Sequence, residues 1–291
     1  MIEQRRQQRI ATLNRIAHHY DQHAKWQQEI AQRLVEHLEP MRIAPKLILD
    51  LGARTGYSTR LLHKRYPKAT IVAVDCAEKM LQQARKYSSW WWRPSLLCAT
   101  EEHLPFASHR FDLIFANLVL AESQNSEQIL CEIRRALRPE GLFLFSTLGP
   151  FTLHELRHSW AQADDKHVHV HDFVDMHDWG DHLVHAGLLD PVMDMEQLTV
   201  LYDDIDTLFR DLRGTGCQNQ SVMRFQYLTG KQRLQKFLQA YEPFRQADGV
   251  WPVTLEVVYG HAWGPEAITT VRLDEKGEAR IPLHAIKMLR R

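Results

Sequence analysis

The most constraining feature of this sequence is an alternation of short apolar runs with helical segments between residues 47 and 149. The runs 47–52 and 70–75 end in glycine and aspartate, and each has the length and composition of a buried parallel strand. Helical patterns of about ten residues separate the runs, and this order is typical of βαβ units. We therefore expect an α/β fold with a doubly wound, mostly parallel sheet. The other strands of this stretch are expected at 95–100, 111–120 and 141–149, and its helices at 57–66, 78–87 and 126–137.

The segments on either side of this stretch are expected to be mainly helical. Residues 5–38 carry apolar side chains at three- and four-residue spacings. Two further strands after residue 150 bring the predicted sheet to seven strands. The strands of this part are expected at 193–202 and 251–263, and its helices at 151–163, 175–187, 204–214 and 231–244. We predict a helical cap at 1–40, a nucleotide-binding core at 41–150, and a C-terminal part of the same domain at 151–291.

Composition excludes several classes of protein. The 291 residues hold 36 Lys and Arg against 36 Asp and Glu, and a net charge of zero argues against a general nucleic-acid binder. No apolar stretch approaches the roughly 20 residues that a membrane-spanning helix needs. The 4 Cys form no CxxC pair, so a reducing compartment is the default. We expect a cytoplasmic protein without nucleic-acid or membrane partners.

A glycine-containing loop follows the first strand of the core. The segment Asp50-Leu-Gly-Ala-Arg-Thr-Gly56 joins this strand to a helix, and its glycines let the backbone approach a ligand closely. Asp75 ends the next strand, where an acid can accept hydrogen bonds from both ribose hydroxyls. The dinucleotide fingerprint GxGxxG and the phosphate loop GxxxxGK[ST] are both absent. The loop therefore indicates a nucleoside ligand without a pyrophosphate.

These motifs resemble those of class I S-adenosylmethionine-dependent methyltransferases. The loop is similar to their D-L-G-x-G-x-G, and Glu101-Glu-His-Leu-Pro-Phe106, followed by Phe111-Asp112, is similar to their D-x-E-x-L-P-F…FD motif near the adenine. The segment Arg138-Pro-Glu-Gly141 resembles their turn before the fifth strand. The resemblance implies a Rossmann-like fold and S-adenosylmethionine as cofactor. The residues that it implies for cofactor binding are Gln27, Asp50, Gly52, Gly56, Asp75, Thr100, Glu101, Glu102 and Asn117.

A narrower resemblance covers residues 15 to 265. The segments Tyr20-Asp-Gln-His-Ala24, Ser146-Thr-Leu-Gly-Pro150 and Glu256-Val-Val-Tyr-Gly-His-Ala-Trp263 resemble motifs of malonyl-acyl-carrier-protein O-methyltransferases. It implies that the protein methylates the free carboxylate of a malonyl thioester on acyl carrier protein, or on coenzyme A. This step would start pimeloyl formation in biotin synthesis. The helices after residue 150 would then bind the substrate and the carrier protein.

A substrate carboxylate needs donors rather than a base. Its reference pKa of about 4 leaves it ionised at neutral pH, so we assign no catalytic acid or base. Arginine and tyrosine can hold a carboxylate. The candidates for this role are Tyr20, Arg210, Arg213, Arg224 and Tyr259, each of which could instead be a surface charge or a packed side chain.

Three departures from the family pattern lie on the nucleotide-binding edge. Arg54 replaces a glycine, Thr100 replaces an aspartate expected at the adenine, and residues 118–122 lack an amide and an aromatic side chain. A left-handed backbone at Arg54 would cost on the order of 1 kcal/mol. An alternative hypothesis is therefore a degenerate methyltransferase fold that binds cofactor weakly or not at all and acts as a carrier-protein-binding or regulatory protein.

The histidines between residues 167 and 185 suggest a second alternative. His167, His169 and His171 would share one side of an extended chain, as zinc or nickel ligands could. The family pattern already places a histidine in this segment without a metal, so we predict no metal site.

Opposite charges are segregated along the C-terminal part. Residues 161–206 hold twelve acids and one base, whereas residues 210–245 hold seven bases and two acids. The basic block is the surface on which we expect an acidic carrier protein to dock, and a solvated helix face is the alternative. Arg233 and Lys236 are the residues chosen to test this docking.

Overall fold

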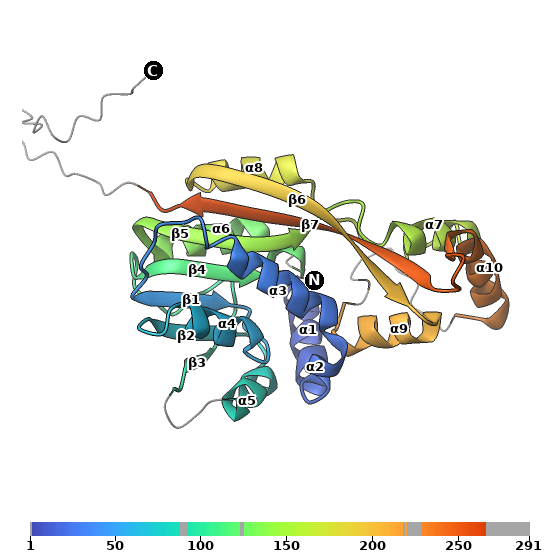
Figure 1. Cartoon of the computed structure of the whole chain (residues 1–291), viewed down its shortest axis with the longest axis horizontal. Helices are drawn as coiled ribbons and strands as arrows, with labels where there is room; N and C mark the ends of the chain where they lie inside the picture. Colours follow the sequence, from blue (N-terminus) through green and yellow to red (C-terminus); the bar gives the residue numbers. More distant parts are fainter. Residues whose placement is uncertain (1, 88–91, 123–124, 218, 220–228, 266–291) are drawn as a thin grey trace, which may run out of the picture.

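The computed structural model describes residues 2–87, 92–122, 125–217, 219 and 229–265. These residues build one seven-stranded sheet in the order β3-β2-β1-β4-β5-β7-β6, shown in Figure 1. Strands β1 to β5 are parallel, and β7 lies antiparallel between β5 and β6. The structure therefore confirms the doubly wound, mostly parallel sheet. The strands are β1 Leu47–Leu51, β2 Thr70–Asp75, β3 Ser95–Cys98, β4 Phe111–Asn117, β5 Leu137–Leu148, β6 Leu189–Tyr202 and β7 Trp251–Trp263.

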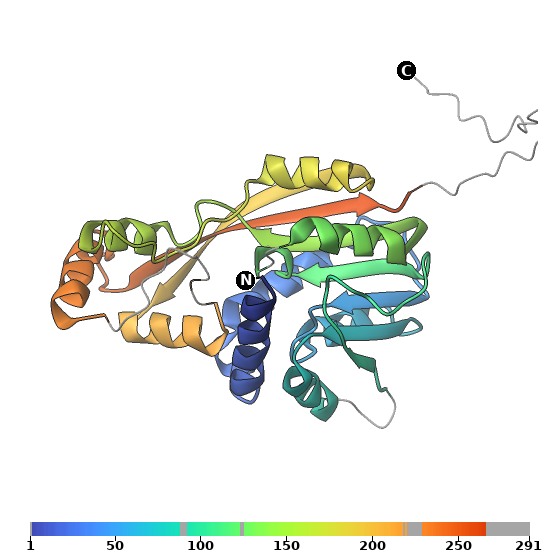
Figure 2. The same ribbon diagram turned by 180° about the vertical axis from the view of Figure 1, so that it is seen from behind.

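Helices cover both faces of this sheet. Figure 1 shows α3 and α4 in front of the strands, whereas α6 and α8 lie in front in the reverse view of Figure 2. The described helices are α1 Ile2–Ile16, α2 Tyr20–His23, α3 Lys25–Glu36, α4 Tyr57–Arg65, α5 Glu78–Lys86, α6 Ser126–Ala136, α7 His154–Ala163, α8 Met176–His185, α9 Ile205–Gly214 and α10 Lys231–Tyr241, with short 3-10 turns at Leu120–Glu122 and Glu242–Phe244. Within the described ranges, no helix combines the length and apolar character needed to cross a bilayer.

The central strands form the core because both of their faces are covered. Every residue of β4 except Asn117 is buried, as are the last four residues of β1. Such strands are continuous apolar runs, which is why their positions could be predicted from sequence. The long strands β6 and β7 extend past the other five to reach α7, α9 and α10 (Figure 1). The C-terminal part thus continues the same sheet and carries the helices beside its far end.

Two predicted elements differ from the structure. The region expected to be helical over 5–38 is divided into three helices, because the chain leaves helical geometry before Tyr20 and at Ala24. The strand expected over 111–120 ends at Asn117, since Leu118 takes a positive φ of 60° and turns the chain out of the sheet. Both changes serve tertiary packing, which local periodicity does not report.

The N-terminal helices are fastened to the C-terminal part at α9. The Nδ1 atom of His23 lies 2.8 Å from a carboxylate oxygen of Asp211. A β carbon added at Gly214 would come within 2.3 Å of the His23 ring, so only glycine allows this close approach. Contacts between α2 and α9 therefore place the substrate-side helices over the same edge of the sheet as the glycine-containing loop.

Candidate functional site

The loop between β1 and α4 depends on its two glycines. Gly52 has a φ of 69°, and a β carbon there would lie 2.4 Å from Val119 Cγ2. Gly56 has a φ of 75° and forms the N-cap of α4. Both positions take a left-handed conformation that side chains disfavour. The glycines thus allow the loop to pack closely against the carboxyl ends of β1 and β4.

Asp50, just before this loop, is hydrogen-bonded to the first turn of α4. Its carboxylate accepts hydrogen bonds from Ser58 Oγ at 2.9 and 2.8 Å and from Thr59 Oγ1 at 2.5 Å, and the residue is 1% exposed. Burial raises the pKa of Asp50 to about 7, although both hydroxyls act to lower it. Asp50 does not line either cavity described below, so its contacts with α4 support the loop.

The raised pKa of Asp50 predicts a pH-dependent effect of Asp50→Asn. The folded protein holds a proton here that the unfolded chain, with a pKa of about 4, releases. Wild-type stability therefore falls as pH rises from about 4 to about 7, by at most about 1.4 kcal/mol per pH unit. The Asn variant lacks this loss and should gain at least about 1 kcal/mol on wild type between about pH 5 and about pH 7.5, measured by urea unfolding. A difference in unfolding free energy that does not change with pH would contradict a protonated Asp50.

Asp75 is the acid at the end of β2, and its carboxylate is fully buried. It accepts hydrogen bonds from the backbone N–H groups of Ala77 at 2.8 Å and Arg54 at 3.0 Å. The guanidinium of Arg54 also lies 3.4 Å from Asp75 Oδ2. Burial raises the pKa of Asp75, and the Arg54 cation opposes this rise. Arg54 takes a φ of 52°, so the residue at the unusual loop position folds back onto the predicted ribose acceptor.

A polar cavity lies above this loop. It encloses about 480 Å³ of empty space, open solvent included. Asp21 on α2 also lines the cavity, and its carboxylate accepts hydrogen bonds from Thr55 Oγ1 at 2.5 Å and from Tyr87 OH at 3.0 Å. The residues that line it include Tyr20, Gln27, Gly52, Arg54, Asn117 and Leu118.

The three predicted adenine-side residues follow β3. Glu101 is 2% exposed, and Arg9 Nη2 on α1 donates to its carboxylate at 3.2 Å. Glu102 has a buried Oε2 atom without a hydrogen-bond partner in the structure. Thr100 is half-buried in the same turn and accepts a backbone hydrogen bond from His103. None of the three lines the polar cavity, so the structure brings together only part of the predicted set.

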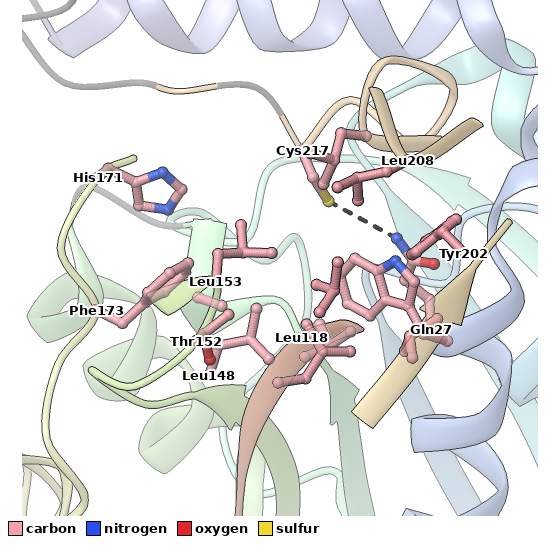
Figure 3. Close-up of a pocket in the computed structure, with 16 residues that line it drawn as sticks. Gln27, Leu118, Leu148, Thr152, Leu153, His171, Phe173, Tyr202, Leu208 and Cys217 are labelled. Carbon is pink, nitrogen blue, oxygen red and sulfur yellow. Dashed lines mark hydrogen bonds between the residues drawn. The ribbon is translucent and has the colours of Figure 1, made fainter. Parts of the chain in front are cut away.

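A second, apolar cavity lies between the N-terminal helices and the C-terminal part. It encloses about 670 Å³, open solvent included, and β6, β7, α9 and the segment before α8 all contribute to its wall. Figure 3 shows His171 and Phe173 at one end, and Gln27 and Tyr202 at the other. Its wall, as far as the described residues define it, contains no lysine or arginine.

The two cavities meet at Gln27 and Leu118, which line both. Gln27 is 7% exposed, and its Oε1 atom is buried with no hydrogen-bond partner in the structure. Among the described residues, its Nε2 atom donates to the weak acceptor Cys217 Sγ, at 3.7 Å, and to no other atom. Asn117 holds the backbone in place, since its Nδ2 donates to the Gln27 carbonyl at 3.1 Å and its Oδ1 accepts from Ser146 Oγ at 2.7 Å. The Gln27 side chain thus places an unused hydrogen-bond acceptor at the point where the two cavities meet.

The predicted substrate residues are not gathered at one place. Tyr20 lines the polar cavity. Arg210 and Arg213 are exposed on α9 and line neither cavity. Tyr259 donates to Glu196 Oε1 at 2.6 Å and stacks on His37, also outside both cavities. Arg224 lies outside the residues that the structure describes.

Most residues that line the apolar cavity were not predicted as site residues from the sequence. Leu118, Tyr202 and His171 are among them. Leu118 lies in the segment 118–122, whose departure from the family pattern was the available signal. His171 belonged to the alternating histidine run and was considered only as a metal ligand.

The histidines divide between two roles. His167 and His169 lie 3.1 and 3.0 Å from the Asp164 carboxylate, which holds the pKa of Asp164 at about 2 against the effect of burial. His171 instead lines the apolar cavity. Among the described residues, no group of three or more His, Cys, Asp or Glu side chains is arranged to hold a metal ion.

The fold is shared with solved methyltransferase-like structures. The YcgJ protein from Bacillus subtilis has a TM-score of 0.58 and 18% sequence identity, covering 82% of this chain and 99% of that chain. A putative methyltransferase from Bacillus halodurans has a TM-score of 0.57 and 16% identity, covering 81% of this chain and 98% of that chain. At such low identity these likenesses concern the fold alone.

Sequence comparison is more specific. The family model described as "Methyltransferase domain" matches residues 49–145. The malonyl-acyl-carrier-protein O-methyltransferase of Halorhodospira halophila is 45% identical over 276 residues, which cover 94% of this chain and 93% of that protein. The protein of the same name from Laribacter hongkongensis is 41% identical over 273 residues, 91% of each chain. The chain therefore belongs to the malonyl-acyl-carrier-protein O-methyltransferase family.

Proposed function

We propose that the protein transfers a methyl group from S-adenosylmethionine to the free carboxylate of a malonyl thioester. The thioester is carried by acyl carrier protein, and the reaction starts pimeloyl formation for biotin synthesis. The meeting of a polar and an apolar cavity at Gln27 carries the proposal, because it offers one site to two ligands of different polarity. Nothing in the comparisons favours the alternative of a degenerate protein without cofactor binding.

The residues around the polar cavity fit the cofactor. Asp75 is not among the residues that line the cavity, and it would offer its buried carboxylate to ribose hydroxyls only after Arg54, which does line it, moves off the Oδ2 atom. Gly52 lets the ligand approach the backbone. The unpartnered Oε1 of Gln27 can accept from the ammonium group of the amino-acid portion. When bound, S-adenosylmethionine supplies an electrophilic methyl group on a positively charged sulfur.

The apolar cavity fits the other substrate. The pantetheine arm is uncharged between its phosphate and the thioester, and it would enter past His171 and Phe173 so that the carboxylate reaches Gln27. Gln27 Nε2 can exchange its weak contact with Cys217 for the stronger carboxylate acceptor. Because the carboxylate is already ionised, the protein has only to hold it in line with the methyl group at about 3 to 3.5 Å. Neutral donors suit this task, since a close cation would reduce the nucleophilicity of the carboxylate.

Methyl transfer to a panel of carrier-protein thioesters tests the proposal. With labelled S-adenosylmethionine, we expect malonyl carrier protein to take up label and the acetyl thioester, which lacks the free carboxylate, to take up none. A malonyl-coenzyme A substrate should also react, with a lower kcat/KM if the carrier protein itself is recognised. Equal labelling of the malonyl and acetyl thioesters would contradict the proposed acceptor.

A further inference from the structure

Helix α10 is held to the rest of the protein by one face. Phe237 and Tyr241 are both fully buried there. The Phe237 ring stacks on Trp160 of α7 with centroids 4.3 Å apart, and Tyr241 OH donates to the Pro252 carbonyl of β7 at 2.7 Å. These contacts fix the helix axis, so its outer face is presented in a defined orientation.

The outer face of α10 combines cations with apolar side chains. Leu234 and Leu238, one turn apart, are 39% and 37% exposed, and Lys231 and Lys236 are exposed as well. We call these four residues the α10 face. Residues 231–241 contain no acid, and the nearest one after them, Glu242, forms an ion pair with Arg245 at 3.4 Å. The α10 face is therefore a basic surface with two leucines at one edge, next to the packed residues Phe237 and Tyr241.

Arg233 is not part of this face. Its Nε atom lies 3.4 Å from the buried carboxylate of Asp164, on the packed side of the helix. Reversal of Arg233, which the sequence alone suggested as a docking test, would bring a second carboxylate against Asp164. Lys231 is the better partner for Lys236 in such a test.

Two contacts join α10 to the wall of the apolar cavity. Trp160, on which Phe237 stacks, itself stacks on His169 at 4.2 Å, two residues before the cavity-lining His171. On the other side, the Phe237 ring lies 5.7 Å from Phe209 of α9, whose neighbour Leu208 lines the same cavity. The packed side of α10 thus adjoins the two segments that border the cavity, and the α10 face lies on the exposed side of the same helix.

We infer that the α10 face is the docking surface for an acidic carrier protein that presents its thioester to the apolar cavity, an inference that rests on the proposed function. Charge complementarity carries it, since acyl carrier proteins are acidic and the face offers cations without acids. Leu234 and Leu238 supply apolar contact at the edge of the same surface, on the side of Lys231. The cavity wall itself has no lysine or arginine among its described residues, so recognition of an acidic carrier falls to the surface outside it.

Charge reversal with a matched control tests the docking surface. The Lys231→Glu/Lys236→Glu variant is compared with Lys64→Glu/Lys68→Glu, which makes the same charge change at exposed positions on and after α4. Isothermal titration with malonyl carrier protein at low salt should show at least about tenfold weaker binding for the α10 variant only. Binding to wild type should weaken as salt is added. Leu234→Ser/Leu238→Ser should also weaken binding.

Steady-state kinetics with two substrates distinguish a loss of carrier-protein docking from damage to the apolar cavity. For the α10 variant, we expect the KM for malonyl carrier protein to rise and the KM for malonyl-coenzyme A to stay at the wild-type value. Equal carrier affinity in the two charge variants would overturn the inference, as would an equal rise of both KM values. A wild-type dimer that the α10 variant dissociates would also overturn it, by naming a second copy as the occupant. Because titration reads carrier binding directly, an inactive wild type would refute the proposed function and leave the docking result readable.

Discussion

Replacement of Arg54 by glycine should tighten binding of S-adenosylhomocysteine about tenfold. In the structure, the Arg54 guanidinium lies 3.4 Å from Asp75 Oδ2, an atom that also accepts the Arg54 backbone N–H. A ribose hydroxyl therefore competes with the guanidinium for this oxygen. A hydrogen bond to a charged group contributes about 1.5 to 3 kcal/mol, and the long 3.4 Å contact places this one at the lower end, which corresponds to about tenfold in affinity. Glycine also suits the left-handed backbone at φ 52°.

The Arg54→Ala variant separates the two effects. Alanine removes the guanidinium but keeps a β carbon at the left-handed position, so it should tighten binding like glycine if competition for Asp75 dominates. Asp75→Ala should lose most of the affinity. Isothermal titration measures all three variants. Unchanged or weaker binding by both Arg54 variants would mean that the guanidinium supports the ligand rather than displacing it.

Replacement of Gln27 by glutamate should reduce kcat/KM for malonyl carrier protein about a hundredfold or more. A carboxylate at the meeting point of the two cavities would repel the substrate carboxylate, and the site is only 7% exposed, so water screens the repulsion poorly. Gln27→Met keeps the approximate volume and removes only the amide, so we expect a smaller loss of about tenfold. The expected order of kcat/KM is thus wild type, then Met, then Glu.

A second glutamine on the same helix provides the control. Gln32 is exposed on α3, and Gln32→Glu makes the same substitution outside both cavities. It should leave kcat/KM near the wild-type value, while thermal unfolding shows that all variants are folded. Wild-type activity in Gln27→Glu would remove this residue from the account and with it the meeting point of the two ligands.

Much of the fold could be predicted because its strands are continuous apolar runs. The bounds of β2 and β7 agree with the predicted ranges, β2 because it is a short apolar run and β7 because its side chains alternate as in a strand. The glycine-containing loop and Asp75 could also be placed, because parallel strands bring their carboxyl ends to one edge. What the sequence could not show is that Arg54 folds back onto Asp75, since this contact depends on the backbone angle of one residue.

The substrate side was harder to predict, for geometric reasons. Tyr259 lies on the same side of β7 as the cavity-lining Leu255, but four residues further along, about 13 Å at the usual rise per residue. Period-two alternation gives the side of a strand and not the position of a cavity along it. On α9, by contrast, helical periodicity already separates Arg210 and Arg213 from the inward-facing Leu208 and Leu212. That signal was available in the sequence and would have assigned both arginines to the surface.

Identification of the reaction product tests the central claim most directly. The purified protein is incubated with S-adenosylmethionine and malonyl carrier protein, and the acyl group is analysed by mass spectrometry. The account predicts one added methyl group, located as an ester on the free carboxylate of the malonyl group and removed by mild ester hydrolysis. An unmodified malonyl group, or a methyl group on any other atom, would contradict the claim that Gln27 brings this carboxylate to the methyl donor.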